Sequence, residues 1–218
     1  TLLCIWLCTF LVAEQPRESH EINTDGLIKI LKQPVVIALL LLCLVLQLAH
    51  APYYVFFSVY LENHGYSETA VSMLWNLGVA AEIALFIVMA KLLPRYGVIR
   101  LFQVTVLLSA LRWFMLGFDV DFLPWLLVAQ CLHMVSFGLY HATAVHVINQ
   151  HFTGAVQGRG QAIYSAATFG LGSSIGAWMS GHGYESLGPS GIFYAAAVIT
   201  LMAWPLLAAM QVFGKRAA

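Results

Sequence analysis

The chain has 218 residues, of which 61% are hydrophobic and only 9% are charged, and its formal net charge is zero. Soluble domains carry about 25% charged residues, so a soluble fold could not cover this much apolar surface, and zero net charge excludes nucleic-acid binding through a basic field. The same length accommodates six membrane-spanning helices of about 20 residues each, so the composition favours an integral membrane protein.

Two segments precede the main apolar part of the chain. Residues 1–13 are apolar but too short to span a bilayer, and they lack the basic n-region and cleavage site of a signal peptide. We interpret them as the remnant of a preceding transmembrane helix, which makes the chain a fragment. Residues 14–33 contain four acidic and three basic residues and no sustained apolar face. This predicts a solvated linker with a short amphipathic helix at Leu27 to Leu31.

Residues 34–213 contain repeated apolar segments, and residues 214–218 form a polar tail. The segments cover approximately residues 34–61, 69–91, 100–118, 124–148, 160–181 and 192–213. Each is long enough to cross the hydrocarbon core of a bilayer. The sequence therefore predicts an all-α integral membrane domain of six transmembrane helices.

Lys and Arg residues are distributed unevenly among the connections. Nine of the ten fall in the linker, the second and fourth connections and the tail, and only Arg112 lies within an apolar segment. The other connections hold five acidic residues and no Lys or Arg. By the positive-inside rule, we expect the linker and the C-terminus to be cytoplasmic in a multi-pass protein of the inner (plasma) membrane.

Glu82 and Arg112 are charged residues inside the second and third predicted spans. Counted from the basic hairpin between these spans, they lie about 14 Å and about 18 Å above its level, at a rise of ~1.5 Å per residue. Charges at such depth cost several kcal/mol, face the bundle interior or water, and usually find a partner. We expect the two to pair with each other, either as a static ion pair or, as we favour, within a transport pathway.

His50, Pro52, Tyr53 and Tyr54 interrupt the apolar run of the first span. A proline kinks a membrane helix, and the backbone groups that it frees need protein or water neighbours. This favours a half-helix that lines a cavity, with His50, Tyr53 and Tyr54 on the substrate pathway. For the tyrosines, an interfacial aromatic belt is the alternative.

Gly172 and Gly176 form a GxxxG pattern in the fifth span. Small residues at this spacing let helix backbones approach closely. We interpret the pattern as a helix-packing feature and not as a binding site.

His133, His141 and His146 in the fourth span spread over more than half of the helix circumference. A metal site would need convergent ligands, and the sequence contains no HExxH pattern, so we expect neither a metal nor a cofactor. His133 lies at about the same depth as Arg112. We therefore place His133, together with His141, on the candidate substrate or proton pathway.

The basic hairpin carries a resemblance to a known family. Six spans after a cytoplasmic linker, with a basic hairpin between the second and third, resemble the C-terminal half of a major facilitator superfamily transporter. Arg95 and Gly97 match the loop signature G-x-L-x-D-R-x-G-R-R, whereas Pro94 replaces its Asp and its paired basic residues are reduced to Arg100. The resemblance implies a gating role for Arg95, Gly97 and Arg100.

Further motifs are similar to the lactose-permease-like proton symporters and the 3-phenylpropionic acid permease group. In the sugar symporters a glutamate follows the motif histidine by three residues, where this chain has Ser136, and Glu82 lies about one turn from their sugar-site glutamate. The resemblance covers residue 34 to the C-terminus. The matching segments are Ser109-Ala-Leu-Arg112, Leu132-His133-Met134, Gln157 to Tyr164 and Tyr184 to Gly188.

The leading interpretation is one half of a proton-coupled secondary transporter. Its site would lie at the midplane, between this half and a missing N-terminal six-helix half. The expected partners are the lipid bilayer, a proton and a small organic substrate, an aromatic carboxylate first and a sugar or nucleoside second. Arg112 would accept the carboxylate, and Glu82 would carry the proton, with His133 as the other candidate.

Two interpretations from other functional classes stay open. An intramembrane enzyme would need the histidines and Glu82 to converge on one site, and we expect no enzyme. A structural membrane subunit would need no charges at mid-membrane depth.

Overall fold

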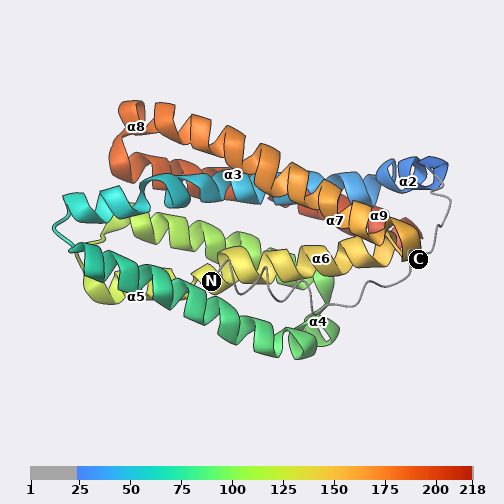
Figure 1. The fold of residues 1–218 in the computed structure, drawn as a ribbon, viewed down its shortest axis with the longest axis horizontal. Helices are drawn as coiled ribbons and strands as arrows, with labels where there is room; N and C mark the ends of the chain where they lie inside the picture. Colours follow the sequence, from blue (N-terminus) through green and yellow to red (C-terminus); the bar gives the residue numbers. More distant parts are fainter. Residues whose placement is uncertain (1–23, 218) are drawn as a thin grey trace, which may run out of the picture.

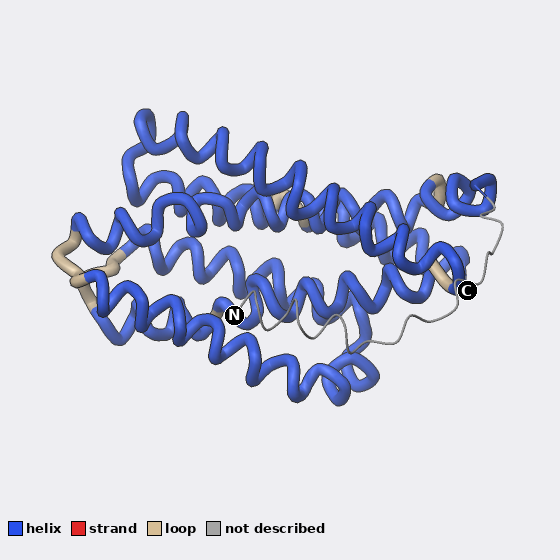
Figure 2. Tube along the Cα trace, viewed as in Figure 1, coloured by secondary structure: helices blue, strands red, loops and turns tan. Residues whose placement is uncertain are grey.

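The computed structural model describes the backbone of residues 24–217 and the side chains of residues 26–214. The predicted remnant at residues 1–13 and the first part of the predicted linker lie outside the described residues. Within the described range the chain is helical apart from short connections and contains no strand (Figure 2). The predicted all-α class is therefore confirmed for this part of the chain.

The helices form a bundle with their axes roughly parallel to its long direction (Figure 1). They are α2 (Thr24–Leu31), α3 (Pro34–Asn63), α4 (Glu68–Phe118), α5 (Leu123–Cys131), the π-helix η1 (Met134–Leu139), α6 (Tyr140–His151), the 3-10 turn η2 (Gly154–Val156), α7 (Gln157–Ser165), the π-helix η3 (Ala166–Gly172), α8 (Ser173–Leu201) and α9 (Trp204–Ala217). In the described part, four helical stretches are long and apolar enough to cross a membrane: Pro34–Asn63, Glu68–Phe118, Leu123–His151 and Gly154–Gly214.

Two long helices are divided by a glycine with a positive φ angle. Gly97 has φ 74° and ψ 161°, and Gly188 has φ 75° and ψ 175°. Glycine enters this region without the steric cost of a Cβ atom. Each turn separates two arms, residues 68–96 and 98–118 in α4, and residues 173–187 and 189–201 in α8. The basic hairpin predicted between the spans that end at residue 91 and begin at residue 100 is therefore too long, because the helices continue to either side of Gly97.

The last predicted span also differs from the structure. Residues 192–213 were expected to form one helix, but the α-helix stops at Leu201 and resumes at Trp204. Pro205 supplies the physical reason, because it has no N–H to donate to the carbonyl of Leu201.

The two ends of the bundle hold different connections. Figure 1 shows α2, the turn that divides α4, and the C-terminus at one end, with the connections that follow α3 and precede α5 at the other. Successive connections thus lie at alternate ends of the bundle, as the alternation of basic and acidic connections along the sequence predicts. Which end faces the cytoplasm stays a prediction.

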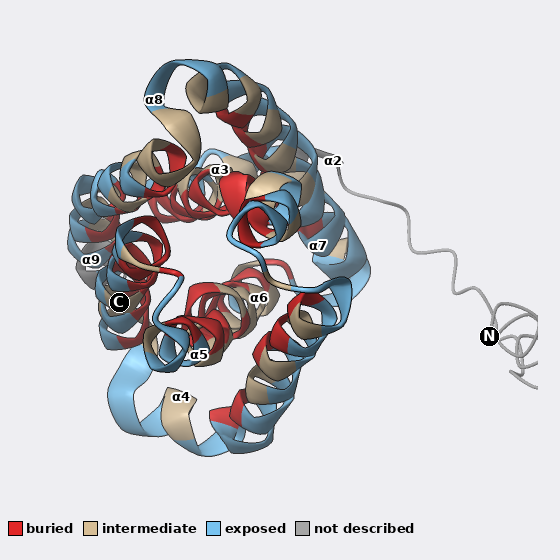
Figure 3. Cartoon of the chain, turned by 90° about the vertical axis from the view of Figure 1, so that its left-hand side faces the viewer, coloured by how far each residue is buried: buried red, intermediate tan, exposed pale blue. Residues whose placement is uncertain are grey.

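The parts of the ribbon that are coloured as buried lie on the inward faces of the helices in the view along the bundle (Figure 3). Leu39, Phe102 and Tyr140 are among the fully buried residues. The outward faces are also apolar, since Ile87 is 75% exposed and Trp178 is 66% exposed. Apolar residues on both faces suit a helix bundle with lipid around it.

The GxxxG glycines pack α8 and η3 onto α3. A Cβ atom on Gly176 would lie 2.6 Å from the carbonyl oxygen of Leu48, and one on Gly172 would lie 3.0 Å from that of Leu44. The Leu48 carbonyl cannot bond to residue 52, because Pro52 has no N–H. The predicted close approach is confirmed, and it lets Gly176 cover the carbonyl that Pro52 leaves free.

Candidate functional site

Six of the seven predicted pathway side chains form one group, which we call the central cluster: His50, Tyr53, Tyr54, Glu82, Arg112 and His133. The ring of His50 lies 5.6 Å from that of Tyr53, 4.9 Å from that of Tyr54 and 5.5 Å from that of His133, measured between centroids. The first predicted span, both arms of α4 and the residues between α5 and η1 supply the cluster. The structure therefore brings these residues together, whereas their role stays a proposal.

Arg112 is fully buried within this cluster. Its Nε donates to the carbonyl oxygen of Ala129 at 2.9 Å, and its Nη1 donates to the Ser136 hydroxyl at 2.7 Å. Its guanidinium carbon lies 4.2 Å from the centre of the Tyr53 ring and 4.6 Å from that of Trp113. Its Nη2 has no hydrogen-bond partner among the described residues. The cation is thus held by neutral acceptors and aromatic faces.

Glu82 pairs with His133 and not with Arg112, which corrects the expected ion pair. Glu82 Oε2 lies 3.6 Å from His133 Nε2, and no ion pair between Glu82 and Arg112 occurs in the part of the chain that the structure describes. A Cβ atom on Gly78 would lie 3.3 Å from His133 Cβ, and one on Gly138 would lie 3.0 Å from Glu82 Cγ. These glycines let the first arm of α4 approach the fourth predicted span closely. Glu82 therefore lies next to His133 and not next to Arg112.

Ser136 is the side chain that accepts a hydrogen bond from Arg112. It is buried, accepts the bond from Arg112 Nη1, and lies within 3.4 Å of the His133 carbonyl, to which it donates. A hydroxyl carries no charge to compensate the guanidinium. Ser136 therefore supplies a neutral acceptor to Arg112 and no negative charge.

Several buried polar atoms within or beside the central cluster lack hydrogen-bond partners among the described residues. They are both ring nitrogens of His50, Nδ1 of His133, Nη2 of Arg112 and Nε2 of Gln130. Buried polar groups are usually hydrogen-bonded, and exceptions often mark functional sites. These atoms lie close together, within or beside the central cluster.

The sequence interpretation missed three contributors to the cluster. Gln130 Oε1 accepts a hydrogen bond from the Tyr53 hydroxyl at 2.9 Å, Trp113 stacks edgewise on His50 at 4.8 Å, and Trp75 lies 4.5 Å from the Tyr53 ring. A lone glutamine in the apolar run that precedes His133 was a usable signal for Gln130. The tryptophans gave no such signal, because apolar spans contain many aromatic residues.

The remaining predicted residues lie outside the central cluster. His141 Nδ1 lies 2.9 Å from the hydroxyl of Tyr164, in a separate pair. Arg95 and Arg100 are exposed beside the turn at Gly97, and Arg95 lies 5.3 Å from the centre of the Tyr96 ring. A gating role for these three hairpin residues stays a proposal.

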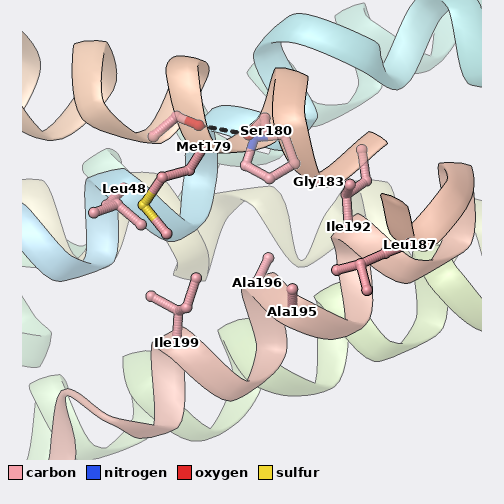
Figure 4. Close-up of a pocket in the computed structure, with 11 residues that line it drawn as sticks. Leu48, Met179, Ser180, Gly183, Leu187, Ile192, Ala195, Ala196 and Ile199 are labelled. Carbon is pink, nitrogen blue, oxygen red and sulfur yellow. Dashed lines mark hydrogen bonds between the residues drawn. The ribbon is translucent and has the colours of Figure 1, made fainter. Parts of the chain in front are cut away.

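A cavity of about 210 Å³ lies between α3 and the two arms of α8 (Figure 4). Leu48, Pro52, Met179 and Ile199 are among its apolar walls. Its only hydroxyl, that of Ser180, already donates to the Gly176 carbonyl at 2.6 Å. Pro52 thus lines a cavity, but the cavity is apolar and contains none of the central cluster.

Over the described residues, no three His, Cys, Asp or Glu side chains converge as metal ligands.

Comparison with known proteins adds independent information. The model of the MFS_1 like family matches residues 1–195 of the chain. The chain is 37% identical over 158 residues to the "Probable 3-phenylpropionic acid transporter" of Escherichia coli (strain K12), a match that covers 72% of this chain and 41% of that protein. The match thus spans about two fifths of the length of this curated relative. No solved structure matches the chain significantly.

Proposed function

Since the chain belongs to the MFS_1 like family and is therefore part of a major facilitator superfamily transporter, we propose that it contributes to the symport of a proton and a small aromatic carboxylate. In this proposal the chain crosses the inner membrane six times, with the arms of α4 counted separately and α8 divided at Gly188. The linker and the C-terminus are cytoplasmic, and a second six-helix half completes the transport path.

The observation that carries the proposal is the environment of Arg112. A buried cation without a carboxylate partner is unfavourable, and none of the hydrogen bonds that the described residues make to it involves an anion. A substrate carboxylate would supply the missing charge and bond to Nη2. The Tyr53 and Trp113 rings that contact the guanidinium would place aromatic surroundings beside a carboxylate bound there. The relative's named substrate, 3-phenylpropionic acid, combines a carboxylate with an aromatic ring.

Substrate access requires a conformational change, because the guanidinium is fully buried in the present state. Tyr53 covers one side of it and is itself fully buried. Alternating access moves helices around a midplane site and would open such a cover. We propose that movement around Tyr53 exposes Arg112 to substrate.

The Glu82 and His133 pair is the proposed proton site. Glu82 retains 14% exposure of its side chain, compared with 6% for His133, so the carboxylate is the more accessible partner. A proton on this pair adds positive charge near Arg112, and a bound substrate carboxylate offsets that charge. Proton and substrate therefore favour each other's binding, which is the thermodynamic requirement for coupling.

The test uses the complete transporter in lipid vesicles with an imposed pH gradient. We expect accumulation of labelled 3-phenylpropionate, but not of its uncharged amide, and we expect Glu82→Gln to abolish accumulation while substrate exchange persists. Equal transport of the amide, or gradient-driven accumulation in Glu82→Gln, would contradict the proposal. Transport of a sugar or a nucleoside instead would favour the alternative substrates considered from the sequence.

A further inference from the structure

Three rings of the fourth predicted span form a column that leads away from the central cluster. His133, Phe137 and His141 follow one another at intervals of four residues. The Phe137 ring centroid lies 5.7 Å from each histidine ring, and the interplanar angles are 2° and 11°. Phe137 belongs to the π-helix η1, and such segments occur frequently at functional sites.

Each end of this column contacts a titratable side chain on another helix. At one end His133 Nε2 lies 3.6 Å from Glu82 Oε2, and at the other His141 Nδ1 lies 2.9 Å from the Tyr164 hydroxyl. Tyr164 is buried, whereas His141 is partly exposed. Two pairs of titratable side chains thus lie on opposite sides of one phenyl ring.

Phe137 separates the two pairs because its side chain can neither donate nor accept a proton. It is fixed by further ring contacts, at 6.0 Å to His50, 5.9 Å to Tyr140 and 6.1 Å to Phe169. Proton transfer needs donor and acceptor within about 3.2 Å, or one water between them. Direct transfer of a proton from the His133 ring to the His141 ring is therefore blocked while Phe137 keeps this position.

We propose that His141, bonded to Tyr164, is a second proton site, and that Phe137 is the barrier between it and the central cluster. This inference rests on the proposed proton symport. A proton released by the Glu82 and His133 pair would bind Nε2 of neutral His141, whose Nδ1–H would donate to the Tyr164 oxygen, and would then leave to the cytoplasm. Among the described residues, the titratable and charged groups near His141 are Tyr164 on α7, which bonds to it, and Glu82 on α4.

Proton leak without substrate tests the barrier. The complete transporter is placed in vesicles that contain a pH-sensitive dye, and the internal pH is followed after an external acid pulse with the membrane potential clamped. We expect Phe137→Ala to admit protons several-fold faster than the wild type, and Phe137→Leu, which keeps an apolar side chain of similar size, to stay tight. Phe137→Val replaces the alanine variant if the latter does not fold.

Transport assays test the second site. We expect His141→Gln to lose most gradient-driven accumulation of 3-phenylpropionate while substrate exchange continues, and Tyr164→Phe to show a smaller loss. His146→Gln is the matched control, because His146 lies on the same helix and bonds to Gln150 instead. A tight Phe137→Ala variant, or wild-type accumulation by His141→Gln, would overturn the inference. Absence of coupled transport in the wild type would refute the proposed function, and the leak assay would still decide on the barrier.

Discussion

Arg112 and Ser136 define the chemistry of the candidate site at the scale of single residues. The guanidinium donates to a backbone carbonyl and to a hydroxyl, and its remaining Nη2 faces no acceptor within the described residues. Planar guanidinium groups bind carboxylates through paired hydrogen bonds, which an ammonium group cannot reproduce. The specificity of this site should therefore depend on whether Arg112 binds a carboxylate of the protein or the carboxylate of a substrate.

Ser136→Glu should introduce a carboxylate that binds Arg112 in place of the substrate's carboxylate. The new side chain would lie next to Arg112 Nη1, now 2.7 Å from the serine hydroxyl, and would compete with an acidic substrate. We expect the apparent affinity for 3-phenylpropionate to fall at least about tenfold, which corresponds to about 1.4 kcal/mol. Competition binding to the purified transporter measures this.

Ser136→Gln is the control for this substitution, because glutamine has nearly the same size without the charge. It should retain clearly more affinity than the glutamate variant. Equal losses in both variants would show that size, and not charge, governs the site.

Arg112→Lys should not rescue substrate binding. Lysine keeps the positive charge but cannot maintain the bonds to Ala129 and Ser136 while presenting a planar group to a carboxylate. We expect a rise in KM for the acid that approaches that of Arg112→Gln. A lysine variant with wild-type KM would contradict this prediction, because it would show that only the positive charge of Arg112 matters.

At the scale of the helices, glycines set the distances that assemble the site. Gly78 and Gly138 let α4 approach the fourth span, and Gly172 and Gly176 let η3 and α8 approach α3. Larger side chains at such contacts force backbones apart. The central cluster is therefore a consequence of helix packing as much as of the residues that form it.

Gly176→Ala should destabilise the bundle, because its Cβ atom would lie 2.6 Å from the Leu48 carbonyl oxygen. Overpacking of this kind costs about 1–3 kcal/mol. Thermal unfolding of the purified transporter should show a lowered Tm. Gly181→Ala is the matched control in the same helix, since no described neighbouring atom lies within 4 Å of the position of its Cβ, and its Tm should not fall.

At the scale of the whole molecule, basic and acidic connections lie at opposite ends of the bundle. Figure 1 places the turn of α4 together with α2 and the C-terminus, away from the connections next to α3 and α5. Reporter fusions at Gly97 and Gly214 should therefore indicate the cytoplasm, and fusions at Asn63 and Pro189 the outside. A single reversed site would contradict the proposed six crossings.

The sequence alone determined the helical class, the order of the apolar helices, and the similar depth of Glu82, Arg112 and His133. Hydropathy and charge are properties of local segments, and a helix converts residue number into depth at a fixed rise. The sequence also indicated that His50, Tyr53 and Tyr54 need neighbours other than lipid, because they are polar residues in an apolar run.

Only the tertiary structure decided which of these residues touch. Depth fixes the height of a side chain but not the direction in which it points, and that direction depends on how several helices pack. The glycine contacts bring Glu82 to His133, while Arg112 on the other arm of α4 bonds to Ala129 and Ser136. The same packing aligned His133, Phe137 and His141 with Tyr164, because ring stacking and the bond between two helices depend on distances that sequence spacing does not contain.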